Sequence, residues 1–167
     1  TSLIHYLLGL RHDYTGTIHI DNQELSRIEI EAFTQIRRID ISTVFQDLQL
    51  FENLSVKENI LLLPEFAKGY DIEDARKMLD VLDIKDKWDQ TVKTLSFGQK
   101  QRVAIIRALM KPFRFLICDE PFSHLDHQNS MKCTALIEKR LKEENAGMIL
   151  LALERECTFE NIKTLEL

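Results

Sequence analysis

The stretch LSFGQKQRVAIIRAL, residues 95–109, lies a few residues before FLICDE, residues 115–120. Ser96 is a residue type that caps helices, because its hydroxyl accepts a backbone N–H of the first turn. We therefore predict a helix from this turn to about Met110. Free N–H groups at a helix start also attract anions, and Gly98 has no side chain to obstruct a phosphate. The turn is either an ordinary capped helix start or a phosphate-binding one.

Two adjacent acids end the apolar run that follows. A strand that ends in Asp119 places a carboxylate at the carboxyl edge of a parallel sheet, where open α/β sheets bind ligands. Asp119 would then hold Mg²⁺, directly or through water, and Glu120 would polarise an attacking water. The alternative is a solvated strand end, although the Pro121 that follows makes the pattern more specific than two acids alone.

Two further polar segments are predicted at the same edge. Gln46 follows the apolar run in IDISTVFQD, residues 39–47, and its amide could contact both a metal and the attacking water. SHLD, residues 123–126, comes soon after the acids. His124 and His127 are three residues apart, which could indicate a metal pair, but the sequence shows no third ligand.

Alternating strands and helices fill the rest of the chain. Strands are predicted at 17–20, 39–47, 114–119, 148–153 and 161–167. Helices are predicted at 3–10, 27–38, 55–62, 71–84, 97–110 and 128–145, the last closed by Gly147. Ser55 and Glu58 have the spacing of a capping box, and Trp88 lies among charges, so we expect it to be partly exposed. Apolar strands separated by helices predict an α/β fold with a mostly parallel sheet flanked by helices.

The composition of the 167 residues excludes several classes of protein. A hydrophobic content of 44% indicates a globular chain, and a net charge of −5 argues against nucleic acid as the main partner. Cys118, Cys133 and Cys157 are widely spaced and form no Cys-x-x-Cys pair, so neither a zinc site nor a disulfide framework is indicated. No apolar run reaches the ~20 residues that a bilayer-spanning helix needs.

Taken together and in this order, Gln46, LSFGQ, the strand with its two acids and SHLD resemble an ABC ATPase domain. The resemblance covers essentially the whole chain. LFENLSVKENI, residues 50–60, looks like the family's segment after the Q-loop, and residues 95–109 look like its signature helix. FRFLICDEP, residues 113–121, looks like its Walker B strand, and SHLD like its D-loop. The resemblance implies a P-loop NTPase fold of the ABC type with an inserted helical subdomain. The domains implied are 1–51 and 113–167 for the RecA-like core and 52–112 for the helical subdomain.

The resemblance also implies a site for ATP and Mg²⁺. In this family two domains pair head to tail and trap ATP between them, and the signature of one faces the phosphates held by the other. The implied nucleotide-binding residues are Thr1, Ser2, Ser96, Gly98, Gln99 and Asp126. The implied metal-binding residues are Thr1, Gln46 and Asp119. The implied catalytic residues are Glu120 and Gln46. The opening TSLIHYLLGL looks like the helix after the Walker A loop, so we expect the sequence to begin just after that loop's Gly-Lys. The truncated chain alone should then be inactive.

The chain departs from the family pattern at two places. Phe97 stands where the family usually has glycine. In MILLALERE, residues 148–156, the positions that match the family's Thr-His-Asp are Ala152, Leu153 and Glu154, so the switch histidine is absent.

We interpret the chain as the ATP-hydrolysing subunit of a membrane transporter. Its 24–51 stretch looks most like ATPases that serve lipoprotein-release, macrolide-efflux or cell-division membrane partners. The expected partners are a second ABC ATPase domain and an integral-membrane permease, with no nucleic acid, at the cytoplasmic face of the membrane. The first alternative is a hydrolysis-impaired regulatory subunit, which the missing histidine favours and Glu120 opposes. The second is a soluble ABC protein that acts on ribosomes or DNA, which the acidic balance opposes.

Overall fold

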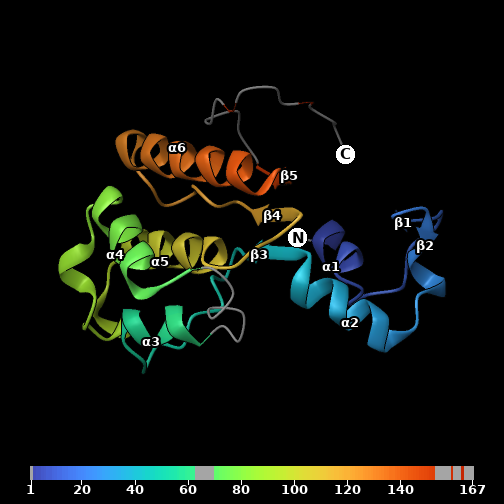
Figure 1. The fold of residues 1–167 in the computed structure, drawn as a ribbon, viewed down its shortest axis with the longest axis horizontal. Coiled ribbons are helices and arrows are strands. Elements are labelled where there is room, and N and C mark those ends of the chain that lie inside the picture. The colour runs from blue at the N-terminus through green and yellow to red at the C-terminus, as the bar shows by residue number, and fades with distance from the viewer. Residues whose placement is uncertain (1, 63–69, 153–158, 160–162, 164–167) are drawn as a thin grey trace.

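The computed structural model describes residues 2–62, 70–152, 159 and 163. A three-stranded parallel sheet lies at its centre, in the order β3 (Ile41–Val44), β4 (Phe115–Asp119) and β5 (Gly147–Leu151) (Figure 1). The predicted α/β fold with a parallel sheet flanked by helices is confirmed. A separate antiparallel hairpin pairs β1 (His19–Ile20) with β2 (Gln23–Glu24).

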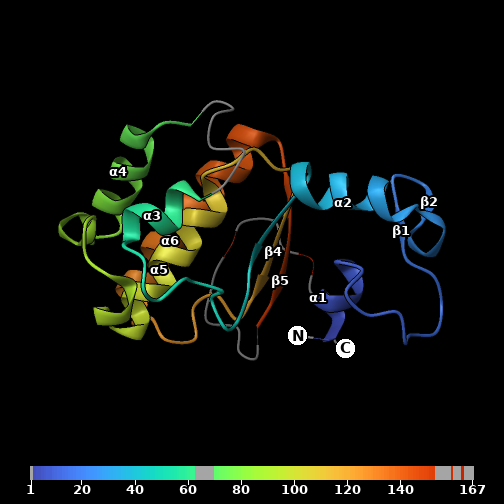
Figure 2. The ribbon, with the colours of Figure 1, turned by 90° about the horizontal axis from the view of Figure 1, so that it is seen from below.

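Helices cover both faces of the sheet. Ile4 and Leu8 from α1 (Ser2–Leu7) and the turn after it pack against Ile41 and Ile117 on one face. On the other face, Leu116 and Cys118 belong to the large core formed with α5 (Phe97–Leu109) and α6 (His127–Glu144). Figure 2 shows the sheet between these two groups of helices. The alternation of side chains along β4 therefore turns Asp119 toward the α1 face, because Asp119 lies two residues after Ile117.

The helices between β3 and β4 build most of the core. The bounds of the longer ones are α3 (Val56–Leu61), α4 (Ile72–Val81) and α5. Short 3₁₀ turns lie at Lys85–Lys87 and Val92–Thr94. Ser55 and Glu58 form the capping box that the sequence predicts, and Asp71 and Asp74 form a second one. Among the described residues of 52–112, the β-structure is an isolated bridge between Ser55 and Thr91. The division of the chain into subdomains at 52 and 112 stays a prediction.

A smaller group of elements lies beside the sheet. It contains α1, the β1–β2 hairpin, a 3₁₀ turn at Leu25–Arg27 and α2 (Ile30–Ile39) (Figure 1). Gly9 has a φ of +61°, and a Cβ atom there would lie 2.5 Å from the ring of Phe33. This close approach favours glycine, because a side chain at this position would collide with the ring of Phe33 from α2.

Two local predictions are wrong. Asn145, with a φ of 50°, ends α6 in the left-handed conformation, whereas Gly147 begins β5. Asparagine tolerates this conformation, so the helix ends two residues earlier than the glycine suggests. Trp88 is 7% exposed rather than partly exposed, because it joins the large core and Arg76 covers its ring at 5.3 Å. The predicted strand 161–167 lies outside the described residues, apart from Lys163.

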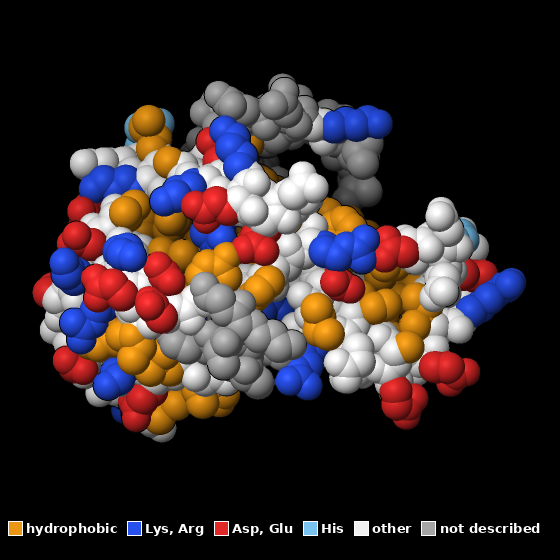
Figure 3. Space-filling model, in the orientation of Figure 1, with side chains coloured by type: hydrophobic (Ala, Val, Ile, Leu, Met, Phe, Trp, Pro, Cys, Tyr) orange, Lys and Arg blue, Asp and Glu red, His pale blue; other side chains and the backbone are white. Residues whose placement is uncertain are grey.

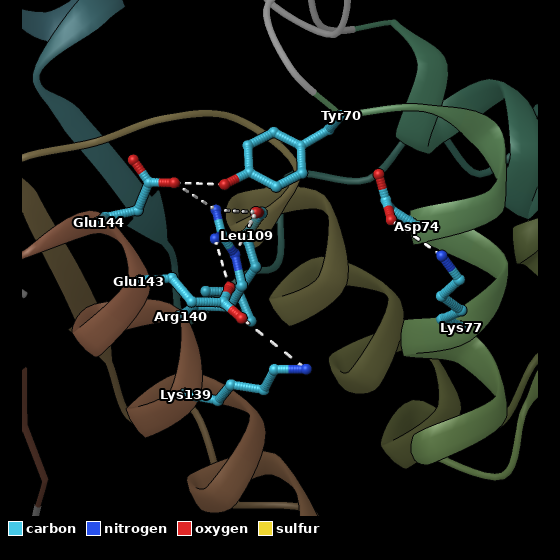
Figure 4. Close-up of polar contacts among 8 residues, drawn as sticks. All are labelled: Tyr70, Asp74, Lys77, Leu109, Lys139, Arg140, Glu143 and Glu144. Atoms are coloured by element: carbon cyan, nitrogen blue, oxygen red, sulfur yellow. Dashed lines mark hydrogen bonds and ion pairs between the residues drawn. The ribbon is translucent and has the colours of Figure 1, made fainter.

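A buried arginine joins α6 to the end of α5 (Figure 4). Arg140 is 2% exposed, and its guanidinium donates two hydrogen bonds of 3.2 Å to the carbonyl oxygen of Leu109. It also forms ion pairs with Glu143 at 2.8 Å and Glu144 at 3.0 Å. Tyr70 stacks on the guanidinium at 4.3 Å and donates a short hydrogen bond to Glu144. The cluster satisfies a charge that would otherwise be costly to bury.

Candidate functional site

The carboxyl edge of the sheet brings three of the predicted site residues together. Val44 pairs with Cys118, so Gln46 and Glu120 each lie two residues past that pair, just beyond the ends of two neighbouring parallel strands. Asp119 is the last residue of β4 and is 2% exposed, whereas Gln46 is exposed. An acid buried at the end of a parallel strand is not the solvated strand end that the sequence left open.

The backbone of Glu120 is held in an unusual conformation. Its φ is 47°, in the left-handed region that costs a residue with a side chain about 1 kcal/mol. Its N–H donates to the carbonyl oxygen of Leu151 at 2.9 Å. Its own carbonyl oxygen accepts from Gln101 Nε2 at 3.0 Å and from Ser123 Oγ at 3.1 Å. These hydrogen bonds hold the backbone of Glu120 in the left-handed conformation. They therefore fix the position of the backbone from which the Glu120 side chain extends.

The start of α5 is capped as the sequence predicts. Ser96 Oγ accepts from the backbone N–H of Gln99 at 3.3 Å, and Gln99 Oε1 accepts from the N–H of Ser96 at 2.9 Å. This capping box uses the side chain of Gln99, a residue expected to bind nucleotide. The first four N–H groups of a helix have no intrahelical partners, and the Ser96 hydroxyl accepts from one of them. The others can still bind an anion.

Close packing joins the start of α5 to the turn that follows Glu120. A Cβ atom on Gly98 would lie 2.9 Å from the backbone oxygen of His124. The ring of Phe97, which is 47% exposed, meets the His124 ring edge to face at 4.1 Å. Gly98 is therefore required by this chain's own packing, apart from any phosphate.

Asp126 is the N-cap of α6. Its carboxylate accepts from the backbone N–H of Asn129 at 2.8 Å and from Asn129 Nδ2 at 2.7 Å. The backbone N–H of Asn129, followed by its side-chain amide, holds the pKa of Asp126 below its usual value. Arg102 of α5 donates to Asn129 Oδ1 at 2.9 Å, so this cap is also tied to α5.

Other predicted residues lie outside the described part of the chain or on its surface. Thr1, Leu153 and Glu154 lie outside the described residues. Ser2 is the exposed first residue of α1, and Ala152 is exposed after β5. His124 and His127 do not develop into a metal site, because no group of three His, Cys, Asp or Glu side chains suited to a metal occurs in the part of the chain that the structure describes.

Sequence reasoning missed two polar residues of α5 that hold the loops of this edge. Gln101 contacts the Glu120 turn, and Arg107 donates to the carbonyl oxygens of Leu48 at 2.9 Å and Gln49 at 2.7 Å. Burial lowers the pKa of Arg107 from its usual value. The available signal was the position of Gln101 on the same helical stripe as Ile105 and Ala108, since a polar residue among buried ones needs partners.

Comparison with known proteins places this geometry in a family. The chain is 32% identical over 155 residues to a lipoprotein-releasing system ATP-binding protein, LolD, of Ehrlichia ruminantium, covering 90% of this chain and 68% of that protein. It is 29% identical over 171 residues to a macrolide export ATP-binding/permease protein, MacB, of Campylobacter jejuni, covering 100% of this chain and 26% of that protein. The predicted likeness to lipoprotein-release and macrolide-efflux ATPases is confirmed.

Solved structures of ATP-binding cassettes also resemble this chain. A dimeric post-hydrolysis structure of the ATP-binding cassette MJ0796, bound to ADP and Pi, matches with a TM-score of 0.75 and 28% identity, covering 92% of this chain and 69% of that one. The chain spans between 26% and 47% of the length of several curated relatives that it matches. A family model described as ABC transporter matches residues 1–123, and the chain therefore belongs to the ABC transporter family.

Proposed function

We propose that this chain is the ATP-binding part of an ABC transporter. It couples the binding and hydrolysis of ATP, at a head-to-tail interface with a second ATPase domain, to movement of a membrane partner. The observation that carries the proposal is that two features lie next to each other. Buried Asp119 and Glu120 stand at the sheet edge, and the exposed, capped start of α5 packs on the turn that follows them. In the proposal, the two acids act on the nucleotide of this chain, and the start of α5 contacts the nucleotide of the partner domain.

The residues at the sheet edge fit Mg²⁺ held together with a triphosphate. Mg²⁺ prefers oxygen ligands and is commonly held by one or two carboxylates plus substrate phosphates. Asp119 supplies a carboxylate and Gln46 an amide oxygen at the same edge, and the hydroxyl of Thr1 is proposed as a further donor. When bound, the ion neutralises charge on the phosphates. Glu120, on its fixed turn, orients and polarises the attacking water.

Ser96 and Gly98 are proposed to act on the nucleotide of the partner domain. The exposed start of α5 presents backbone N–H groups and a helix dipole, which favour a γ-phosphate. Such a contact forms only when ATP is present, so ATP binding can drive closure of the dimer. Gln99 and Asp126 would support this surface mainly as capping residues, since their side chains bond to Ser96 and Asn129.

A groove beside the sheet is the proposed contact for a permease. It is a cavity of about 290 Å³ between β3, α3 and α5, and its lining includes Phe51 and Leu62, which are 58% and 50% exposed.

The described helices include none with the length and apolar character that a membrane span requires. On the face shown in Figure 3, acidic and basic side chains intermix, an arrangement that suits nucleic acid poorly. We place the protein at the cytoplasmic face of a membrane.

The test uses the full-length protein with the substitution Glu120→Gln. ATP binding should persist, hydrolysis should fall by about 10²- to 10⁴-fold because the group that polarises water is lost, and a closed dimer should accumulate with ATP. Steady-state ATPase, nucleotide binding and sizing with ATP give the three readouts, with exposed Glu31→Gln on α2 as a matched control. Unchanged hydrolysis would remove Glu120 from the mechanism. Affinity capture that brings down an integral-membrane permease separates a transporter from a soluble ABC protein.

A second candidate is a hydrolysis-impaired subunit that binds nucleotide and dimerises. The sequence observation that favours it is Leu153 at the position of the family's histidine, two residues after Leu151, whose carbonyl oxygen accepts from the backbone N–H of Glu120. Leu153 cannot donate a hydrogen bond to a phosphate or to water. The ATPase rate of the full-length protein with its partner distinguishes the two candidates.

A further inference from the structure

Gln101 forms a bridge of two hydrogen bonds inside the protein. Its side chain is 2% exposed, although it ends in an amide. Gln101 Nε2 donates to the carbonyl oxygen of Glu120 at 3.0 Å, and Gln101 Oε1 accepts from the backbone N–H of His124 at 3.2 Å. The amide nitrogen donates to a carbonyl oxygen and the amide oxygen accepts from an N–H, so the two hydrogen bonds fix the orientation of the Gln101 amide. One side chain of α5 thus closes the turn from residue 120 to residue 124.

An amide is an expensive side chain to bury at this position. A buried polar group destabilises the fold unless it is hydrogen-bonded, and a methionine of similar length would fill the space without that requirement. What the amide adds is direction, since it holds a backbone carbonyl and a backbone N–H at fixed places. The carbonyl belongs to Glu120, whose φ of 47° needs support from its surroundings.

The same helix carries the surface that meets the partner's nucleotide. Gln101 lies five residues after Ser96, within the first turns of α5, and the backbone of Gly98 packs closely on the carbonyl oxygen of His124. A shift of the start of α5 would therefore move Gln101 and Gly98, the two residues of this helix that contact the turn from residue 120 to residue 124.

We propose that Gln101 is a positioning residue, which sets the backbone of Glu120 and links it to the α5 surface that contacts the partner's ATP. It acts through Glu120 and touches no nucleotide itself. The inference rests on the proposed function, because it assumes that Glu120 acts on water and that the start of α5 faces a second nucleotide. It adds a route, inside one protomer, between the two nucleotide sites of the dimer.

The bridge itself can be tested without any ATPase activity. Hydrogen exchange of the segment 120–126 is measured in the full-length protein for the wild type, Gln101→Met and Gln101→Glu, with exposed Gln35→Met on α2 as the control. In Gln101→Met the His124 amide should exchange about tenfold faster, because one hydrogen bond is lost. Gln101→Glu keeps an acceptor for that N–H, so slow exchange at His124 should survive. Unchanged exchange in Gln101→Met would overturn the bridge.

The consequence for catalysis is tested in the same variants. Both Gln101→Met and Gln101→Glu should lower kcat by about 10- to 100-fold with little change in KM, since small displacements of a reacting group are costly and ATP binding does not involve Gln101. In a Glu120→Gln background, Gln101→Met should change the residual rate and the ATP-dependent dimer by less than about twofold, because the group it positions is already gone. Gln35→Met should behave as wild type.

Three outcomes separate the possibilities. A kcat that is unchanged in Gln101→Met overturns the positioning role. Equal losses of rate with and without Glu120, together with a weaker ATP-dependent dimer, also overturn it and leave a role in folding alone. A wild-type protein that neither hydrolyses ATP nor forms an ATP-dependent dimer overturns the proposed function instead, and the exchange measurement still decides whether Gln101 holds the turn.

Discussion

At the scale of single residues, two separate requirements favour glycine at position 98. The close approach of the His124 carbonyl excludes a Cβ atom within the chain itself, and a phosphate of a second nucleotide would exclude one from outside. A substitution such as Gly98→Asp therefore cannot separate the two. Ser96 offers a cleaner test, because its hydroxyl bonds inside the chain only to its own capping box among the contacts described.

We expect Gly98→Ala to destabilise the protomer by about 1–3 kcal/mol without any nucleotide, since the crowded backbone has to shift. Ser96→Ala should cost about 0.5–2 kcal/mol for the lost cap and should also weaken ATP-driven dimerisation. Thermal unfolding and sizing with ATP measure the two effects. The control is Thr94→Ala, which removes a nearby exposed hydroxyl that bonds to the carbonyl oxygen of Thr91. If Ser96→Ala dimerises as readily as this control, Ser96 has no part in the trans contact.

Leu153 is the second residue that we expect to affect the ATPase rate. The carbonyl of Leu151 accepts from the N–H of Glu120, so the chain leaves β5 beside the proposed catalytic turn. A histidine two residues on, as in the family pattern, would add a hydrogen-bond donor near the attacking water. Leu153→His should raise the ATPase rate of the full-length protein with its partner by about 10²- to 10³-fold, the value of one preorganised donor. A wild-type rate already in the usual range for enzymes, with no gain from this change, would contradict the expectation.

At the scale of elements, the segment that leads into α4 is fastened to α6 by Tyr70. Burial, followed by the hydrogen bond to Glu144, raises the pKa of Tyr70 to about 12. Because the folded state favours the neutral phenol, its contribution to stability is complete below pH 10, the ordinary pKa of tyrosine. It is lost as the pH rises toward 12, since the unfolded chain releases this proton first.

Tyr70→Phe should remove this part of the pH dependence. We expect the free energy of unfolding of the wild type to fall more steeply between about pH 10 and pH 12 than that of the variant. Denaturant unfolding at several pH values measures both curves, and the difference cancels the titration of lysines common to both chains. Tyr14→Phe, at a tyrosine whose ring lies 5.3 Å from the ring of Tyr6 in α1, is the matched control. Parallel curves for the wild type and Tyr70→Phe would show that Tyr70 titrates normally.

At the scale of the whole molecule, parallel pairing of the strands places Gln46, Asp119 and Glu120 at one sheet edge. The phosphate loop of P-loop enzymes also requires a Gly-Lys pair, which the 167 residues do not contain. We expect this chain, produced alone, to fold and to show no measurable heat of ATP binding by calorimetry. The full-length protein, titrated under the same conditions, is the comparison. Tight ATP binding by the 167 residues alone would show that Asp119 and Gln46 suffice.

The sequence by itself determined the order of the main helices and strands and the capped starts of several helices. Capping residues at Ser55 and Ser96 mark helix starts through bonds that span three residues, so they can be identified from adjacent letters. The apolar run before Asp119 predicts a buried strand, and parallel pairing then places Asp119 and Gln46 at one edge. The ordered set of motifs was enough to indicate the family, because it combines several segments with separate local requirements.

Only the tertiary structure decided how these elements constrain one another. The Gln101 amide bonds to residues 19 and 23 positions away, and a one-dimensional pattern does not contain that distance. The burial of Trp88 among charged neighbours, and the left-handed turn at Glu120, likewise depend on which elements pack against them. Local rules follow from bonds between near neighbours in the chain. The orientation of a catalytic turn depends on contacts between distant ones, which exist only when the helices have packed on the sheet.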